Sequence, residues 1–221
     1  LVVKLAGPGG DVVPQLNRPG LAELNDRGMD PPGGDTSALL GAIRQILFNA
    51  QFGVSADANA YYAAFRLPDT LFSLVAGGAL SSAMIPVLLA TQQEDGESAA
   101  ARLIRLVLTT LLCFFSLIVL LALLFTPTLV NRLLAPGFDA TTSQLTISLT
   151  RLMLIQPLIL AVGSVATAVL NSRNQFLLTG LSIVSHNLAL ITGILLARFI
   201  PALGIYGPTF GVIVGAIFQV L

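Results

Sequence analysis

Two arginines interrupt apolar sequence near the start of the hydrophobic part of the chain. Arg44 lies between GAI and QILF, and Arg66 lies two residues before Pro68. An arginine at the centre of a membrane helix costs at least about 2.5–3.5 kcal/mol, so it usually faces a cavity, a partner or a headgroup. Because a guanidinium binds phosphate through a planar fork, the pair predicts an anion-binding cavity. The alternatives are contact with lipid headgroups or pairing with Asp57 or Asp69.

Other features concern helix geometry. Pro68 predicts a kink, because proline removes a helical hydrogen bond, and broken helices line the substrate path in transporters. A kink that serves only packing is the alternative. Gly207, Gly211 and Gly215 recur at a four-residue spacing, which predicts a close approach of another helix. The sequence has no Ser–His–Asp set, Walker loop or HExxH motif, so it predicts no enzyme, no cofactor and no metal site.

The elements that must position these residues are membrane helices. Five runs without any charged residue exceed twenty residues, and they cover 70–93, 106–131, 152–172, 174–197 and 199–221. A bilayer core needs about 20 apolar residues for one helical crossing, and these runs are too long for barrel strands. The composition agrees, with 55% hydrophobic and 10% charged residues. The formal net charge of zero predicts no nucleic-acid partner. The lone Cys113, in the most apolar run, is expected to be buried.

The predicted fold is an all-α, polytopic transmembrane bundle with about six spans. Residues 1–35 are rich in glycine and proline and predict a loop-rich, disordered segment. Residues 36–221 predict a six-helix lobe that is truncated at its C-terminal end, with spans at 37–55, 60–89, 106–134, 145–170, 176–199 and 205–221. Arginines in the loops after the second and fourth spans favour a cytoplasmic N-terminus.

Several separate blocks then carry a resemblance to a known family. The stretch FGVSADANAYYAAFRLPDTLFSLVAGGALSSAMIPVLLA and the later LAPGFD, HNLALI and GIYGPTFGVIVGAIFQVL agree with it in order and spacing. Over about residues 37–221 the chain resembles the MviN/MurJ family of lipid II flippases, within the multidrug/oligosaccharidyl-lipid/polysaccharide exporter superfamily. The resemblance implies the N-terminal lobe of a two-lobed flippase in the bacterial cytoplasmic (inner) membrane, whose partner would be the C-terminal lobe.

The resemblance also suggests site residues. Arg44 and Gly41 match family positions in the first span, and Arg66 matches a basic position before the proline. Asn59 stands where the family has an acidic residue, and Asp57 lies two residues away. The expected substrate-binding set is therefore Arg44, Arg66, Asn59 and Asp57. Family charges are replaced at four further places, namely Ala38, Phe72, Ser73 and Gly77.

The function that the resemblance implies is alternating-access translocation of a polyprenyl-diphosphate-linked peptidoglycan precursor, lipid II, across the membrane. A cationic cavity between the lobes would pair with the diphosphate while the tail stays in lipid. The alternative is a degenerate family member that acts as a non-transporting membrane scaffold or exports a different lipid-linked glycan. The replaced charges motivate this alternative.

Overall fold

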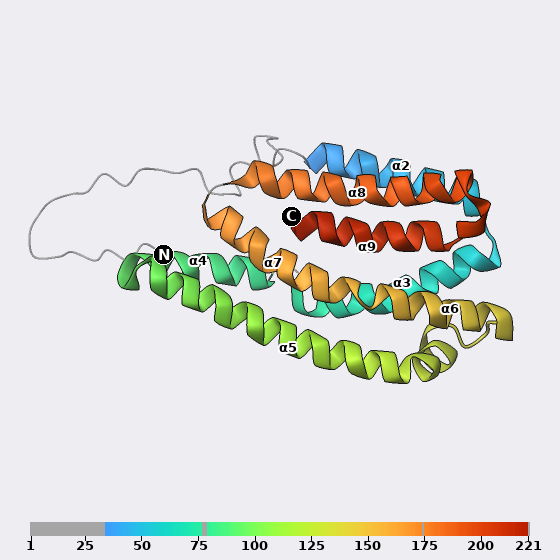
Figure 1. The fold of residues 1–221 in the computed structure, drawn as a ribbon, viewed down its shortest axis with the longest axis horizontal. Helices are drawn as coiled ribbons and strands as arrows, with labels where there is room; N and C mark the ends of the chain where they lie inside the picture. Colours follow the sequence, from blue (N-terminus) through green and yellow to red (C-terminus); the bar gives the residue numbers. More distant parts are fainter. Residues whose placement is uncertain (1–33, 77–78, 174, 221) are drawn as a thin grey trace, which may run out of the picture. The chain divides into compact units, whose positions relative to one another are not determined.

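The described part of the chain is helical. The computed structural model describes residues 34–76, 79–173 and 175–220, and the regular structure within these ranges consists of helices (Figure 1). The predicted all-α class is therefore confirmed. Residues 1–33 of the predicted N-terminal segment lie outside the described residues, and the first described helix begins at Gly34.

The helices follow the predicted spans closely. In chain order they are α2 (Gly34–Phe52), α3 (Ala56–Ala76), α4 (Ala79–Asp95), α5 (Glu97–Leu129), the π-helix η1 (Val130–Leu134), α6 (Ala140–Met153), α7 (Gln156–Ser172), α8 (Phe176–Phe199), the 3₁₀-helix η2 (Pro201–Leu203) and α9 (Tyr206–Val220). The predicted fifth span at 176–199 has the bounds of α8. The fourth predicted span corresponds to two helices, and the described parts of the second are α3 and α4.

The presence of a proline explains the division of the fourth predicted span into α6 and α7. α6 ends at Met153 and α7 begins at Gln156 with Pro157 in its first turn. Proline lacks an amide hydrogen, so it fits the first turn of a helix, where that hydrogen has no helical partner. In the second predicted span, α3 instead continues through Pro68, whose side chain is fully buried, and the interval to α4 lies outside the described residues. The kink at Pro68 stays a prediction.

Among the described helices, α8 and α9 make the most extensive contact, and α8 also packs on α2. α3 packs on α6, and α4 packs on α5 and α7. In Figure 1, α4 lies along the first part of α5, and α9 lies beside α8. A buried apolar cluster joins α2, α3, α6, α8 and α9 and includes Phe48, Tyr61, Met153, Ile194 and Val212. This cluster holds α2 and α3 against the rest of the lobe.

Glycines allow α8 and α9 to approach closely. A methyl group at Gly193 of α8 would lie 2.5 Å from the carbonyl oxygen of Gly207 and 2.9 Å from the Cα of Gly211. One at Gly207 would lie 2.6 Å from the Cβ of Ala197, and one at Gly215 would lie 2.9 Å from Nδ1 of His186. Real Cβ contacts under 3.0 Å essentially do not occur. Glycine is therefore required at these positions, because any larger side chain would collide with the neighbouring helix. Small residues are expected where membrane helices approach closely.

Four fully buried threonine hydroxyl groups form hydrogen bonds inside their own helices. Thr126, Thr146, Thr150 and Thr209 are fully buried, and each hydroxyl donates to the carbonyl oxygen four residues earlier at 2.6–2.9 Å. An unpaired hydroxyl in an apolar interior costs about 1–3 kcal/mol, and these bonds avoid that cost. These threonines therefore need no ligand or neighbouring helix to explain their burial.

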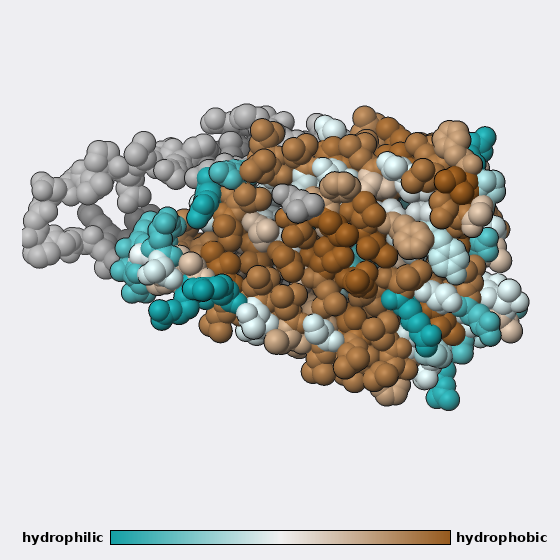
Figure 2. Space-filling view, viewed as in Figure 1, coloured by the Kyte–Doolittle hydropathy of each residue, from teal (hydrophilic) through white to brown (hydrophobic). Residues whose placement is uncertain are grey.

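Three stretches of the described chain are long and apolar enough to cross a membrane, judged by length and composition. They are Glu97–Leu134, Ala140–Ser172 and Leu177–Phe199. α9 is also apolar but has only 15 residues, whereas α2 and α3 carry charged and amide side chains. Figure 2 shows apolar side chains across the middle of the visible face and polar side chains near the helix ends.

The position of Cys113 on α5 differs from the prediction. Cys113 is exposed, although the sequence led us to expect a buried thiol. Its neighbours Phe114, Leu117, Leu120 and Leu121 are exposed as well. An apolar run in a membrane protein has no need to turn every side chain inward, because hydrocarbon is an equally suitable environment. Cys113 therefore lies on an apolar outer face of the helix.

Asp139 caps α6. Its carboxylate accepts the backbone N–H groups of Thr141 at 3.1 Å and Thr142 at 3.2 Å, and the Thr142 hydroxyl at 2.5 Å. The Thr142 hydroxyl, followed by the backbone N–H groups, holds the pKa of Asp139 below its usual value. Because the pKa of Asp139 is lower in the folded than in the unfolded protein, the ionised carboxylate stabilises the fold. This contribution is complete above the unfolded-state pKa of about 3.9 and is lost as the pH falls through the folded-state pKa.

We therefore expect Asp139→Ala to lower the thermal midpoint at pH 7, because the first turn of α6 loses its cap. Asp139→Asn should keep most of the cap, since the amide oxygen still accepts hydrogen bonds, but should lose the ionised partner. The measurement is thermal unfolding in detergent between pH 7 and about pH 3. The difference between the native protein and Asp139→Asn should shrink as the pH falls, and a difference that grows on acidification would contradict this assignment.

Candidate functional site

A small cavity between α2, α3 and α8 contains the most informative arginine. The cavity has a volume of about 70 Å³. It is lined by Arg44, Gln45, Phe48, Tyr61, Tyr62, Phe65, Leu190 and Ile194. Arg44 is half-buried and is the only charged side chain among these lining residues. The cavity therefore combines one guanidinium with aromatic and apolar walls.

Aromatic rings form the wall between α2 and α3. The ring of Phe48 on α2 lies 4.8 Å from that of Tyr61 and 5.2 Å from that of Tyr62, measured between centroids. Tyr61 is also stacked on Phe65 at 6.3 Å. Aromatic pairs at such distances contribute about 0.5–1.5 kcal/mol beyond the area they bury. This packing fixes the position of the helical turn that carries Arg44.

Three uncharged polar side chains form a hydrogen-bonded network beside the cavity, and two of them, Gln45 and Tyr62, line it. Nε2 of Gln45 donates to the Tyr62 hydroxyl at 2.6 Å and lies 3.5 Å from Oδ1 of Asn49. The Tyr62 hydroxyl in turn donates to Oδ1 of Asn49 at 3.2 Å. The network links α2 to α3, and all three side chains are exposed. Sequence reasoning missed it, although the four-residue spacing of Gln45 and Asn49 places two amides on one face of an apolar helix.

The other expected site residues lie on an exposed face of α3. Asn59, Tyr62, Arg66 and Asp69 follow each other at spacings of three and four residues, so they share that face, and all are exposed. Arg66 lies one turn beyond Tyr62 and does not line the cavity with Arg44. Asp57 is exposed in the first turn of α3, where a carboxylate complements the helix dipole. α3 thus presents a polar stripe that passes the cavity at Tyr62.

The positions where family charges are replaced add no charge to this region. Ala38 is exposed on α2, Phe72 is half-buried on α3 and Ser73 is exposed on α3. Gly77 lies outside the described residues. Among the lining residues of the cavity, Arg44 remains the only group able to form a charge-assisted hydrogen bond with an anion.

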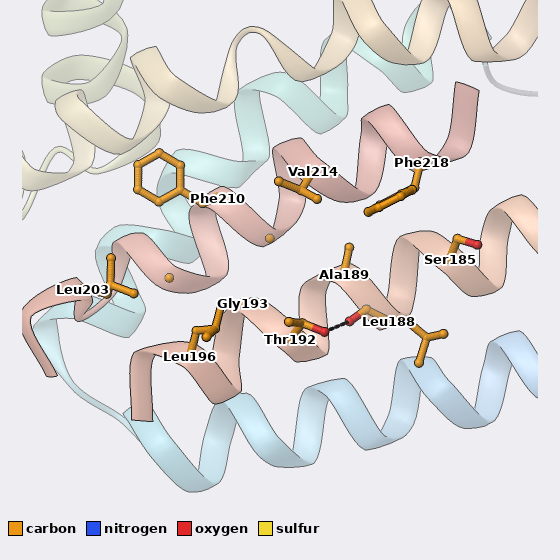
Figure 3. Close-up of a pocket in the computed structure, with 12 residues that line it drawn as sticks. Ser185, Leu188, Ala189, Thr192, Gly193, Leu196, Leu203, Phe210, Val214 and Phe218 are labelled. Carbon is orange, nitrogen blue, oxygen red and sulfur yellow. Dashed lines mark hydrogen bonds between the residues drawn. The ribbon is translucent and has the colours of Figure 1, made fainter. Parts of the chain in front are cut away.

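A larger groove between α8 and α9, of about 450 Å³, has different chemistry (Figure 3). Its two hydroxyl groups bond within α8, from Ser185 to the Leu181 carbonyl and from Thr192 to the Leu188 carbonyl. Phe210, Val214 and Phe218 of α9 lie along its other side. The groove has no charged lining residue, so it is unsuited to a diphosphate.

A bundle of apolar helices, three stretches of which are long enough to cross a membrane, defines the class of helical membrane proteins. The comparisons give the family. The model of the family described as Lipid II flippase MurJ matches residues 48–221. The chain belongs to the MurJ family of lipid II flippases.

Individual relatives agree with this assignment. The chain is 29% identical over 168 residues to the probable lipid II flippase MurJ of Rhizobium tropici, covering 75% of this chain and 32% of that protein. It is 30% identical over 186 residues to the lipid II flippase MurJ of Thermosipho africanus, covering 82% and 36%. A solved structure of a lipid II flippase MurJ in an inward closed conformation superposes with a TM-score of 0.68 at 27% identity, covering 86% of this chain and 39% of that one. The chain spans about a third of the length of the curated relatives it matches.

Proposed function

We propose that this chain is the N-terminal lobe of a flippase that carries a polyprenyl-diphosphate-linked peptidoglycan precursor across the bacterial cytoplasmic membrane. The observation that carries the proposal is the position of Arg44, half-buried at a cavity between α2, α3 and α8 with no other charged lining residue. A diphosphate offers several anionic oxygens, and a guanidinium binds such oxygens in a planar fork. The polyprenyl tail would stay in the surrounding hydrocarbon.

In the proposed mechanism, a C-terminal lobe completes the cavity and rocking of the two lobes exposes it to each side of the membrane in turn. The polar stripe of α3, from Asn59 past Arg66, would line the approach to Arg44. The role of this chain would be to compensate the negative charge of the diphosphate, because an unpaired charge is costly in the apolar interior of the membrane. No covalent bond forms or breaks in this process.

The test of this proposal is genetic complementation. The protein that carries this chain should restore growth to a bacterial strain depleted of its lipid II flippase, at matched membrane abundance. A protein that inserts normally but does not restore growth would favour the alternative, a membrane scaffold or an exporter of a different lipid-linked glycan. The observation that motivates the alternative is the replacement of family charges at Ala38, Asn59, Phe72 and Gly77.

We also propose a cytoplasmic N-terminus, based on arginines near the loop between α4 and α5. On a Cys113→Ala background, a membrane-impermeant thiol reagent added outside intact cells should label Asp139→Cys and spare Glu97→Cys. Both positions are exposed in the folded lobe. Labelling of the two positions after cell lysis controls for reactivity. The reverse pattern in intact cells would show that the lobe has the opposite orientation.

A further inference from the structure

The polar network beside Arg44 has spare hydrogen-bonding capacity. The Tyr62 hydroxyl accepts from Gln45 Nε2 and donates to Asn49 Oδ1, so it orients both amides. Within the described part of the chain, these bonds leave two N–H donors on Asn49 Nδ2 and the Gln45 Oε1 acceptor without a partner. All three side chains are exposed. The free groups are therefore accessible to a ligand.

The spare groups suit a neutral ligand with hydroxyl and amide groups. A diphosphate is bound most strongly by cationic donors, which Gln45, Asn49 and Tyr62 do not supply. A sugar offers hydroxyl groups, an N-acetylated sugar also offers an amide, and both present apolar C–H faces. The exposed ring of Tyr62, packed on Phe48, supplies an apolar surface next to the free amide groups. The cavity wall therefore places a sugar-compatible surface directly beside a phosphate-compatible guanidinium.

We propose that Asn49 and Gln45 bind the N-acetylated sugar next to the diphosphate, while Arg44 binds the diphosphate itself. Tyr62 is then a positioning residue, because its hydroxyl holds the two amides in the required orientation. This inference rests on the proposed function and extends it to substrate selection. A site built to hydrogen-bond a substrate group rejects an analogue that lacks the group, because its own polar atoms are left unpaired. The trio would therefore distinguish sugar-bearing carriers from the bare lipid diphosphate.

The experiment measures the affinity of the protein that carries this chain, in lipid nanodiscs, for two probes. One is a polyprenyl diphosphate bearing an N-acetylhexosamine, and the other is the same polyprenyl diphosphate without sugar. Asn49→Leu should weaken binding of the sugar-bearing probe about tenfold and change binding of the bare probe by less than about twofold. Tyr62→Phe, which keeps the ring, should weaken the sugar-bearing probe severalfold and spare the bare one. Arg44→Ala should weaken both.

Gln144→Leu provides a matched control, because it also replaces an exposed amide but lies on α6, outside the Arg44 cavity. It should bind both probes as the native protein does. If the native protein binds neither probe, the proposed function fails and this inference fails with it. If it binds both probes equally well, or if Asn49→Leu and Tyr62→Phe weaken both to the same degree, the sugar assignment is overturned while the proposed function stands.

Discussion

Arg44→Ala is expected to abolish growth in a strain that depends on the protein carrying this chain as its only lipid II flippase. The guanidinium is the one charged group lining the cavity between α2, α3 and α8. A hydrogen bond to a charged group contributes about 1.5–3 kcal/mol, so its loss should weaken diphosphate binding roughly 10- to 100-fold. Membrane abundance should stay close to normal, because the aromatic contacts that hold α2 on α3 do not involve Arg44.

Two further variants separate charge from geometry. Arg44→Lys should restore part of the growth, because lysine retains the charge but lacks the planar fork. Arg105→Ala is the control, since Arg105 is exposed and donates to the Ala101 carbonyl of its own helix. Growth of the Arg44→Ala strain at the native rate would mean that Arg44 only contacts lipid headgroups.

The second large effect concerns the contact between α8 and α9. Gly193→Ala should lower the free energy of unfolding by about 3 kcal/mol, the upper end of the usual range for overpacking. The new methyl group would lie 2.5 Å from a backbone oxygen of Gly207 and 2.9 Å from the Cα of Gly211, and backbone atoms of a packed helix cannot move aside cheaply. Gly211→Leu should act in the same direction, because a Cβ there already meets the Ala189 carbonyl oxygen at 3.0 Å.

Whether a Gly→Ala substitution stabilises or destabilises the protein shows whether space exists at that position. Alanine favours a helix over glycine by up to about 1 kcal/mol, so the substitution should be neutral or stabilising wherever space exists. Gly41→Ala is therefore the matched control, because Gly41 lies inside α2 and a Cβ there meets nothing within 4 Å. The measurement is thermal or denaturant unfolding in detergent. Equal stability of Gly193→Ala and Gly41→Ala would contradict the close packing of α8 on α9.

Much of the fold is predictable from the sequence because a membrane helix requires a long apolar run without charged residues. Long charge-free runs predicted a helical bundle, and the bounds of α8 agree with the predicted span at 176–199. The division between α6 and α7 was not predicted, because hydropathy does not show where one helix ends inside an apolar run. The burial of Cys113 was predicted wrongly for a related reason, since an apolar outer face is stable in lipid.

The site was less predictable than the fold. Arg44 could be singled out because it is the only formal charge within an apolar stretch. Which side chains surround it depends on how α2 meets α3 and α8, and spacing along the chain does not determine this. Gln45 and Asn49 carried a weak signal as a polar pair on one helix face. Tyr62, seventeen residues away from Gln45, joins them only in the folded lobe.

The central claim is that Arg44 and the side chains around it contact the diphosphate-linked glycan. In-cell photocrosslinking tests it most directly, with a benzophenone amino acid in place of Tyr62 at the cavity, or of Leu117, which is 57% exposed on the outer face of α5. Mass spectrometry of the adducts should find a polyprenyl diphosphate glycan attached at position 62 and phospholipid at position 117. Adducts at position 62 that contain only phospholipid, or the same glycan adduct at both positions, would contradict the account.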